Sequence, residues 1–204
     1  MRSYHQNCGL ARAADLLGER WTLLIVRDLL IAPRRFSELE RRMKGMGTNL
    51  LSKRLKEMAE AGLVATSEAH RLYALTAMGR ALEPIVLDLV RWSLSWVGMP
   101  PVPGDLHFPD WDLLGLKALF VANPNLQEAV TARFAEADWS AWVRIDRTAY
   151  TYGLGEPAIA PDIDFACSIQ QLGNEAFLAG LPASQSATAR QFLASFQFDR
   201  AAAM

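Results

Sequence analysis

The segment Thr48–Gly62, TNLLSKRLKEMAEAG, carries the clearest structural pattern in this chain of 204 residues. Its apolar residues recur at steps of four and three, which places them on one face of a helix: Leu51, Leu55 and Met58. Thr48 is predicted to cap the start of this helix, and Gly62 to end it in a left-handed conformation. The opposite face is polar and basic, so the helix is either a solvated surface element or one that contacts a partner.

Two further helices are predicted upstream. Residues 9–18 have apolar positions at helical spacing, and Gly18 closes that helix. Residues 22–30 are apolar around most of the circumference, which is typical of a helix at the centre of a small core. Pro33 ends this second helix.

A short helix directly precedes the Thr48–Gly62 segment. Ser37 is predicted to cap it, with Phe36 as the apolar residue before the cap, so that the helix covers Glu38–Met43. The turn Gly45–Gly47 joins it to the next helix, and two helices joined in this way form a helix-turn-helix unit.

Beyond Gly62 the hydrophobic period changes to two. Residues 63–65 and 72–75 are predicted to form a hairpin, or wing, around the polar link 66–71. Thr76 is predicted to cap a long helix over residues 77–97 that Pro84 kinks. The apolar surface of this helix is too broad for a small domain to cover, which favours a partner subunit.

The charge is divided unevenly along the chain. Residues 1–97 contain fifteen Lys and Arg against ten Asp and Glu, whereas residues 98–204 contain six against twelve, within a net charge of −1. A basic half followed by an acidic half indicates two modules, of which the first can approach a polyanion. The segment 98–110, with MPPVPG near its start, is predicted to be the linker between them.

The composition excludes several classes of protein. Cys8 and Cys167 form neither a disulfide framework nor a metal-ligand spacing, and no nucleophile elbow, phosphate loop or dinucleotide fingerprint is present. No signal peptide is visible and no apolar run is long enough to span a bilayer. The sequence therefore predicts a cytoplasmic protein that is not an enzyme, holds no cofactor or metal and does not enter a membrane.

The second module mixes helical and alternating patterns. Helices are predicted over 111–121, 173–179 and 187–196, and residues 126–134 fit either a helix or part of a strand. Alternation of apolar residues predicts strands over 139–146, 148–152 and 163–170. The order of these elements is typical of an α+β layer.

The N-terminal motifs resemble those of the HxlR family, bacterial winged helix-turn-helix transcriptional regulators related to the MarR group. GERWTLLI, RRFSEL, LLSKRLKEM, EAGLV and the LT and GR of LTAMGR occur in order between residues 8 and 95. The resemblance implies a homodimer formed through the first and last helices of this module. It also implies a recognition helix at 48–61 and a wing that touches DNA.

An α-helix fits the major groove of B-DNA, where residues early on the helix reach base edges and basic residues neutralise phosphates. The residues expected near base edges are Thr48, Asn49, Ser52 and Lys53. Arg54 and Lys56 either contact phosphate or pack within the module. Arg34 and Arg35 are expected to hold the flanking backbone or simply to be solvated, and Arg71 to enter the adjacent minor groove.

Cys8 has two interpretations. Some members of the family sense oxidants or electrophiles through a cysteine near the start of the first helix, and Cys8 resembles it in position. A helix N-terminus favours the reactive thiolate. The alternative is an inert thiol buried at the dimer interface.

The C-terminal module resembles, more loosely, a sterol-carrier-protein-like domain. The residues that carry this likeness begin with DWDLLGLKALF and end with RQFLASFQF. The resemblance implies a pocket for an apolar small molecule between the sheet and the helices. The aromatic residues that either line this pocket or pack in the core are Trp111, Trp139, Trp142, Tyr150, Tyr152, Phe165 and Phe177.

The sequence thus predicts an α+β chain with a winged helix-turn-helix domain over 1–97, a linker over 98–110 and a smaller sterol-carrier-like domain over 111–204. The expected function is a homodimeric regulator, with repression as the expected mode, that binds a pseudo-palindromic DNA duplex and responds to an apolar effector. The alternative is a lipid or small-molecule carrier that uses the winged module only to dimerise.

Overall fold

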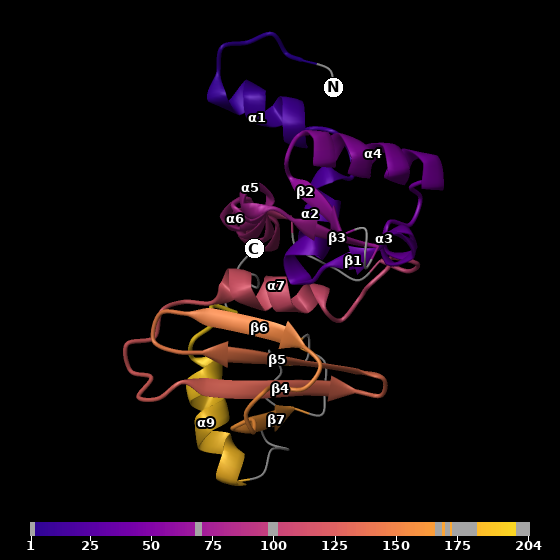
Figure 1. Cartoon of the computed structure of the whole chain (residues 1–204). Coiled ribbons are helices and arrows are strands. Elements are labelled where there is room, and N and C mark those ends of the chain that lie inside the picture. The colour runs from indigo at the N-terminus through magenta and orange to yellow at the C-terminus, as the bar shows by residue number, and fades with distance from the viewer. Residues whose placement is uncertain are drawn as a thin grey trace. The chain divides into compact units, whose positions relative to one another are not determined.

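The computed structural model describes residues 3–67, 71–97, 102–165, 169, 172 and 183–198. The chain divides into two compact units, Met1–Val86 and Leu87–Met204, each with its own sheet (Figure 1). No helix in the described part is both long and apolar enough to cross a membrane.

The N-terminal unit is a winged helix-turn-helix. Its helices are α1 (Gly9–Leu17), α2 (Thr22–Ile31), α3 (Phe36–Arg42), α4 (Thr48–Glu60) and α5 (Ala77–Arg80). Its antiparallel sheet has the order β1-β3-β2, with β1 (Arg34–Arg35), β2 (Val64–Ser67) and β3 (Leu72–Leu75). The predicted helices and hairpin are therefore present, whereas the two-residue strand β1 was not predicted.

One buried cluster holds these elements together. Helix α2 contributes three residues with little or no exposure, and α3 and α4 pack against it through their apolar faces: Ile25, Val26, Leu29, Leu39, Met43, Leu51, Leu55 and Met58. The predicted apolar stripe of α4 is thus the inner face of the helix. Burial of such side chains contributes roughly 1.5–3 kcal/mol each.

The two ends of α4 were predicted with different success. At the end of the helix, Gly62 has φ +77°, and the Leu63 N–H donates to the Met58 carbonyl at 2.9 Å. This is a Schellman motif, as expected for a glycine after a helix. At the start, the N-cap is Gly47 rather than Thr48. Thr48 lies inside the helix, and its hydroxyl donates to Glu40 Oε1 at 2.5 Å.

Ser37 is not a cap, which corrects a second prediction. Helix α3 begins at Phe36, with Arg35 as its N-cap, and the Arg35 N–H donates to Glu38 Oε2 at 2.7 Å. Because Arg34 and Arg35 pair with β3, the chain stays extended until the residue before Phe36.

The long helix predicted over 77–97 is two helices rather than one kinked helix. Thr76 caps α5 as expected, accepting from the Gly79 N–H at 3.1 Å, and α6 then covers Glu83–Trp96. Pro84, the second residue of α6, has no N–H to donate, and its ring would clash with the carbonyl four residues earlier in a continuous helix. A proline is tolerated in the first turn of a new helix, so the chain breaks at Ala81 and Leu82.

Gly79 in α5 approaches the backbone closely, and this predicts the effect of a substitution. A Cβ there would lie 2.2 Å from the Leu63 carbonyl oxygen, whereas a Cβ at Gly115 would meet nothing within 4 Å. Gly79→Ala is therefore expected to destabilise the protein by roughly 1–3 kcal/mol. Gly115→Ala should stabilise it by about 0.5–1 kcal/mol through helix propensity. Thermal unfolding of both variants checks this, and equal shifts would contradict it.

The C-terminal unit has an α+β fold around a four-stranded sheet of order β6-β5-β4-β7. Its elements are α7 (Trp111–Leu119), β4 (Val130–Glu136), β5 (Trp139–Ile145), β6 (Tyr150–Leu154), β7 (Ile163–Phe165) and α9 (Ala183–Leu193). Strand β7 pairs with β4 in parallel and the other pairs are antiparallel. The segment 126–134, for which helix and strand were both open, enters strand β4. Helix 173–179 lies outside the described residues.

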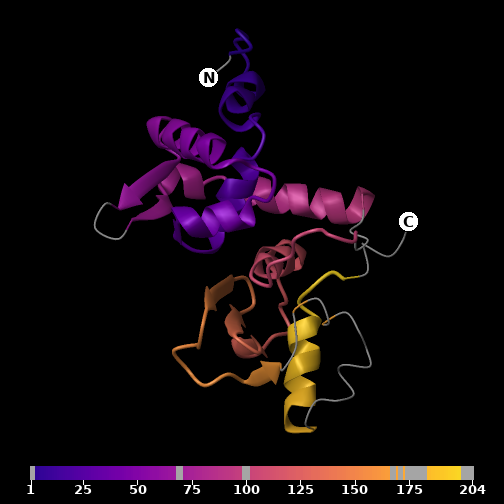
Figure 2. The same ribbon diagram turned by 90° about the vertical axis from the view of Figure 1, so that its right-hand side faces the viewer.

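Helix α9 covers one face of this sheet (Figure 2). Phe192 on α9 lies with its ring centroid 6.2 Å from that of Phe165 and 6.5 Å from that of Phe134. The other side chains that point to this face of the sheet are also buried, among them Ala132, Ala141, Val143 and Ile163. The opposite face is more polar and carries Arg133, Trp142 and Asp164.

Candidate nucleic-acid interface

The outer face of α4 is an exposed polar surface of the helix-turn-helix unit. Because Leu51, Leu55 and Met58 fix the inner face, the residues at the intervening positions point to solvent: Thr48, Asn49, Ser52, Lys53 and Lys56. Lys53 Nζ lies 3.9 Å from Glu57 Oε1 and Lys56 Nζ 3.8 Å from Glu60 Oε1. Such exposed pairs are weak, so both ammonium groups can exchange their partner for a phosphate.

Arg54 differs from these residues because it is buried. Its side chain is 8% exposed, and its guanidinium lies 2.7 Å from Glu57 Oε2 and 2.9 Å from Glu19 Oε2. This placement corresponds to packing within the module, which was one of the two interpretations of Arg54.

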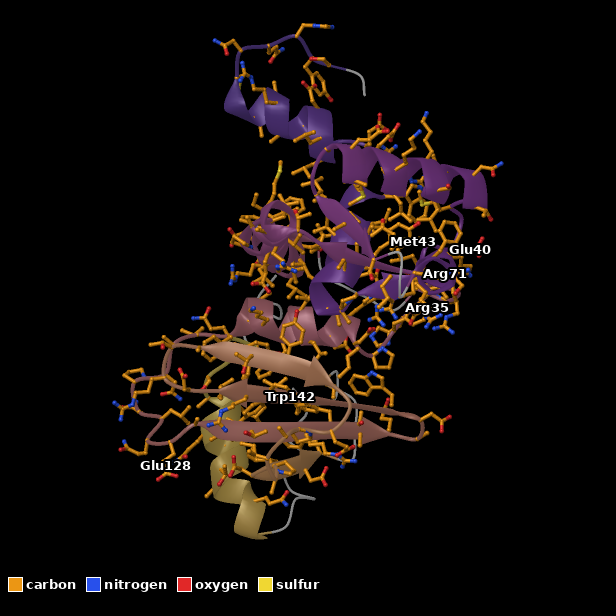
Figure 3. The ribbon with its side chains drawn as sticks, in the orientation of Figure 1. Arg35, Glu40, Met43, Arg71, Glu128 and Trp142 are labelled. Carbon is orange, nitrogen blue, oxygen red and sulfur yellow. The ribbon has the colours of Figure 1, made fainter. Side chains whose placement is uncertain are left out.

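The predicted backbone contacts also separate into buried and exposed groups. Arg34 is buried and its Nη1 lies 4.0 Å from Glu38 Oε1. Arg35 and Arg71 are exposed. Arg35 pairs with Leu72 across the sheet, so the two arginines lie at the same end of it, as Figure 3 shows. Arg71 has φ +51°, which directs the chain as it enters β3.

Three exposed residues near this surface were not predicted as contacts. Arg41 on α3 and Lys44 in the following turn add positive charge. Leu50, in the first turn of α4, is an exposed apolar side chain. Its position outside the stripe of Leu51, Leu55 and Met58 could have predicted from the sequence that it is exposed. Arg42, by contrast, is buried and forms an ion pair with the buried Asp28 of α2.

Cys8 is a free, exposed cysteine immediately before α1. Donation to its sulfur by the backbone N–H groups of Ala11 and Leu10 lowers the pKa of the thiol below its ordinary value. The helix N-terminus therefore favours the thiolate, as the sequence predicted.

A lowered thiol pKa has a measurable consequence. Thiolate is the reactive form, so a larger fraction of Cys8 is reactive at neutral pH than of an ordinary cysteine. Alkylation of Cys8 by iodoacetamide is expected to be faster at pH 7 than that of an unstructured cysteine peptide. Its rate should reach half-maximum at a lower pH. Mass spectrometry of the Cys8 peptide measures both, and a midpoint equal to that of the peptide would contradict the prediction.

The aromatic residues predicted to line a ligand pocket do not gather in one place. Phe165 stacks on Phe134 at 5.1 Å within the core. Tyr150 is buried, donates its hydroxyl to the Leu113 carbonyl at 2.9 Å, and has its pKa raised well above the ordinary value by burial.

Trp142, in contrast, lies on the opposite face of the sheet, against Gly153. Trp139 and Tyr152 are half-buried. The ring of Trp111 packs edge-on against that of Phe108, with 5.0 Å between the ring centroids. Phe177 and Cys167 lie outside the described residues. Trp142 therefore cannot share a pocket with Tyr150 or Phe165.

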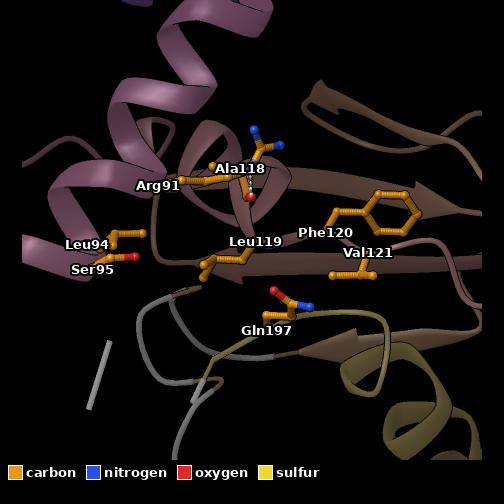
Figure 4. Close-up of a pocket in the computed structure, with 8 residues that line it drawn as sticks. All are labelled: Arg91, Leu94, Ser95, Ala118, Leu119, Phe120, Val121 and Gln197. Atoms are coloured by element: carbon orange, nitrogen blue, oxygen red, sulfur yellow. Dashed lines mark hydrogen bonds between the residues drawn. The ribbon is translucent and has the colours of Figure 1, made fainter. Parts of the chain in front are cut away.

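A cavity of about 190 Å³ occurs elsewhere in the C-terminal unit (Figure 4). Its walls come from α6, the end of α7 and the segment after α9: Arg91, Leu94, Ser95, Ala118, Leu119, Phe120, Val121 and Gln197. Arg91 Nε donates to the Ala118 carbonyl at 2.6 Å, and Gln197 N–H donates to the Leu119 carbonyl at 2.9 Å. The described residues contain no cluster of three or more His, Cys, Asp or Glu side chains that could hold a metal ion.

Comparison with known proteins places the N-terminal unit in a family. Residues 16–100 match the family model of the HxlR-like helix-turn-helix. YvaP of Bacillus subtilis (strain 168), an uncharacterized HTH-type transcriptional regulator, is 36% identical over 91 residues, which are 42% of this chain and 84% of YvaP. The HTH-type transcriptional regulator YodB of the same organism is 30% identical over 86 residues, 40% of this chain and 77% of YodB.

Among solved structures, quinone-bound YodB from B. subtilis is 31% identical in sequence to this chain, with a TM-score of 0.39. The match covers 41% of this chain and 93% of the YodB chain. The match to YvaP spans most of that protein, and the matched residues include the whole helix-turn-helix and wing of this chain. The chain therefore belongs to the HxlR-like helix-turn-helix family of transcriptional regulators.

Proposed function

We propose that the chain is a homodimeric regulator, acting as a repressor, that binds a pseudo-palindromic DNA duplex through the exposed face of α4. The observation that carries this proposal is the two-sided character of α4. One face is fully buried, so the helix is fixed, and the other presents Asn49, Ser52 and Lys53 to solvent. Family membership favours a regulator over a carrier that uses this unit only to dimerise.

The proposed contacts divide into two groups. Thr48, Asn49, Ser52 and Lys53 occupy the N-terminal half of α4, and in helix-turn-helix proteins this half reaches base edges. Asn side chains can bind adenine through two hydrogen bonds, and Lys can donate to guanine. Lys56 and Arg35 are exposed cations that would contact phosphates, and the exposed Arg71 would enter the adjacent minor groove. Arg54 and Arg34 are left out of the proposed contacts because they are buried.

The direct test is selection of duplexes from a random pool by the full-length protein. The proposal expects enrichment of an inverted repeat whose half-sites lie about one helical turn apart; the enriched sequence is here called the selected duplex. Its affinity should fall steeply with salt, because each neutralised phosphate releases counterions. Failure to enrich any sequence would sink the proposal.

The proposed dimer rests on an apolar stripe along α6. Ile85, Leu89, Trp92 and Trp96 recur at helical spacing and are all exposed. Large exposed apolar patches of this kind mark interaction surfaces. A second copy of the chain is the partner that a pseudo-palindromic site requires, because two recognition helices must bind two half-sites.

A matched pair of isoleucines tests the dimer. Ile85, on the stripe, is 47% exposed, and Ile159, in the loop before β7, is 53% exposed. Ile85→Glu is expected to weaken dimerisation by about tenfold or more, since a carboxylate would be buried without a partner. Ile159→Glu should leave it unchanged. Sedimentation over a range of concentrations measures both, and an unaffected dimer in Ile85→Glu would place the interface elsewhere.

We also propose an apolar effector that binds the C-terminal unit. The cavity beside α6 and α7 contains apolar walls from Leu94, Leu119 and Val121, and a cavity of about 150 Å³ is sufficient for one aromatic ring. An apolar molecule in this cavity would agree with the sterol-carrier-like character predicted for the unit. Native mass spectrometry of freshly purified protein tests this, with an unliganded mass and no thermal stabilisation by apolar compounds as the opposing result.

A further inference from the structure

The turn between α1 and α2 contacts the helix-turn-helix unit at two separate points. The carboxylate of Glu19 accepts from Arg54 Nη2 at 2.9 Å, which joins the turn to the middle of α4. The ring of Trp21 lies next to Gly45, where an added Cβ would be 4.0 Å from Trp21 Cη2, so the turn also packs against the segment between α3 and α4.

Arg54 is the only buried Lys or Arg among the residues of α4, all of which the structure describes. Two carboxylates bind its guanidinium, and they differ in the element from which they come. Glu57 is on the same helix, three residues on, so its bond to Arg54 leaves the position of α4 unchanged. Glu19 comes from another element. Its bond therefore fixes α4 relative to the rest of the unit, with the Arg54 side chain 8% exposed and the Glu19 side chain 41% exposed.

The turn that carries Glu19 has a fixed conformation. At Gly18 a side chain is excluded, because a Cβ would lie 2.6 Å from the Ala14 carbonyl oxygen. Trp21 has φ +81°, a left-handed conformation that is rare for a bulky residue and persists only where its surroundings enforce it. Those surroundings are the apolar cluster, against which Trp21 packs, and the Arg20 guanidinium, 5.0 Å from the ring centroid.

We propose that Glu19 is a positioning residue for DNA recognition: through Arg54 it sets the orientation in which α4 presents Asn49 and Lys53 to the bases. This inference rests on the proposed function. Base contacts depend on orientation to within a fraction of an ångström, whereas contacts to the regular backbone charge tolerate small rotations. Loss of the Glu19–Arg54 bond should therefore reduce affinity for the selected duplex more than affinity for an unrelated one.

The test compares Glu19→Gln with Glu57→Gln in the full-length protein. Each variant removes one carboxylate from Arg54 with little change of shape, and only the first removes a bond between elements. Affinities for the selected duplex and for an unrelated duplex of equal length are measured at one salt concentration, well below the unfolding temperature of each variant.

For Glu19→Gln we expect affinity for the selected duplex to fall about tenfold and affinity for the unrelated duplex to change by less than about twofold. Glu57→Gln, which also removes the weak 3.9 Å pair with the exposed Lys53, should change both by less than about threefold.

Three results would overturn the inference. They are an unchanged preference in Glu19→Gln, an equal loss on both duplexes, and a loss of preference in Glu57→Gln as large as that in Glu19→Gln. The wild-type selection is read first, so a protein that selects no duplex overturns the proposed function and this inference together. A wild type that selects one, with variants that match it, overturns only the role of Glu19.

Discussion

Replacement of both Asn49 and Lys53 by alanine is expected to weaken binding to the selected duplex by roughly 100-fold or more. Each side chain that makes two hydrogen bonds to a base contributes about 1–3 kcal/mol of discrimination. Both residues lie on the exposed face of α4 and away from the buried cluster. The unfolding temperature should therefore change little, because surface substitutions of this kind stay within about 0.5 kcal/mol.

Lys56→Ala is the matched comparison, since Lys56 lies one turn further along the same face. As a phosphate contact it should weaken binding to selected and unrelated duplexes by similar factors and lower the salt dependence by about one unit. Fluorescence anisotropy at several salt concentrations separates the two behaviours. A double variant that binds the selected duplex as the wild type does would show that α4 is not the element that reads the bases.

Asp28→Ala is expected to destabilise the N-terminal unit by roughly 3–5 kcal/mol. The Asp28 side chain is 0% exposed, and its carboxylate bonds to Arg42 of α3 and, at 2.8 Å, to Arg27. Its removal leaves the buried guanidinium of Arg42 without this carboxylate, and breaking a buried ion pair from one side costs about this much. This pair links α2 to α3, so its loss should also loosen the helix-turn-helix.

The surface supplies a matched control for this variant. Asp88 pairs with Arg91 at 2.5 Å, but its side chain is 73% exposed. Asp88→Ala is expected to cost no more than about 1 kcal/mol. Urea unfolding followed by tryptophan fluorescence compares the two aspartates. Equal costs would mean that burial does not determine the strength of the Asp28 pair.

The N-terminal unit was predictable because its signals are local. A stripe of apolar residues determines which face of α4 is buried, and Gly62 is needed where φ is positive. The errors occurred where a longer-range contact decided the outcome. Arg35 is held in an extended conformation by its pairing with β3, and the helix starts at the next residue, Phe36. Ser37 therefore lies inside the helix and cannot be its cap. The sequence left two interpretations of Arg54 because Glu19, whose carboxylate binds its guanidinium, lies 35 residues away in the chain.

The C-terminal unit was less predictable for a different reason. Alternation located strand β5 correctly, but it does not say which face of the strand meets the helices. The aromatic residues were chosen by type, and Trp142 has the opposite parity to Tyr150, so they lie on different faces of the sheet. The parallel pairing of β7 with β4 brings together segments that no local pattern connects.

That pairing pattern also sets an order of folding. In the N-terminal unit the bonds between elements span shorter stretches of chain, such as the 35 residues between Glu19 and Arg54. In the C-terminal unit, Asn123 Nδ2 donates to Ser195 Oγ across 72 residues, and Phe120 bridges to Phe196. Contacts of such long range slow folding, and domains fold as units during synthesis. We therefore expect the DNA-binding unit to fold on the ribosome before Ser195 and Phe196, which complete the C-terminal core, have been synthesised.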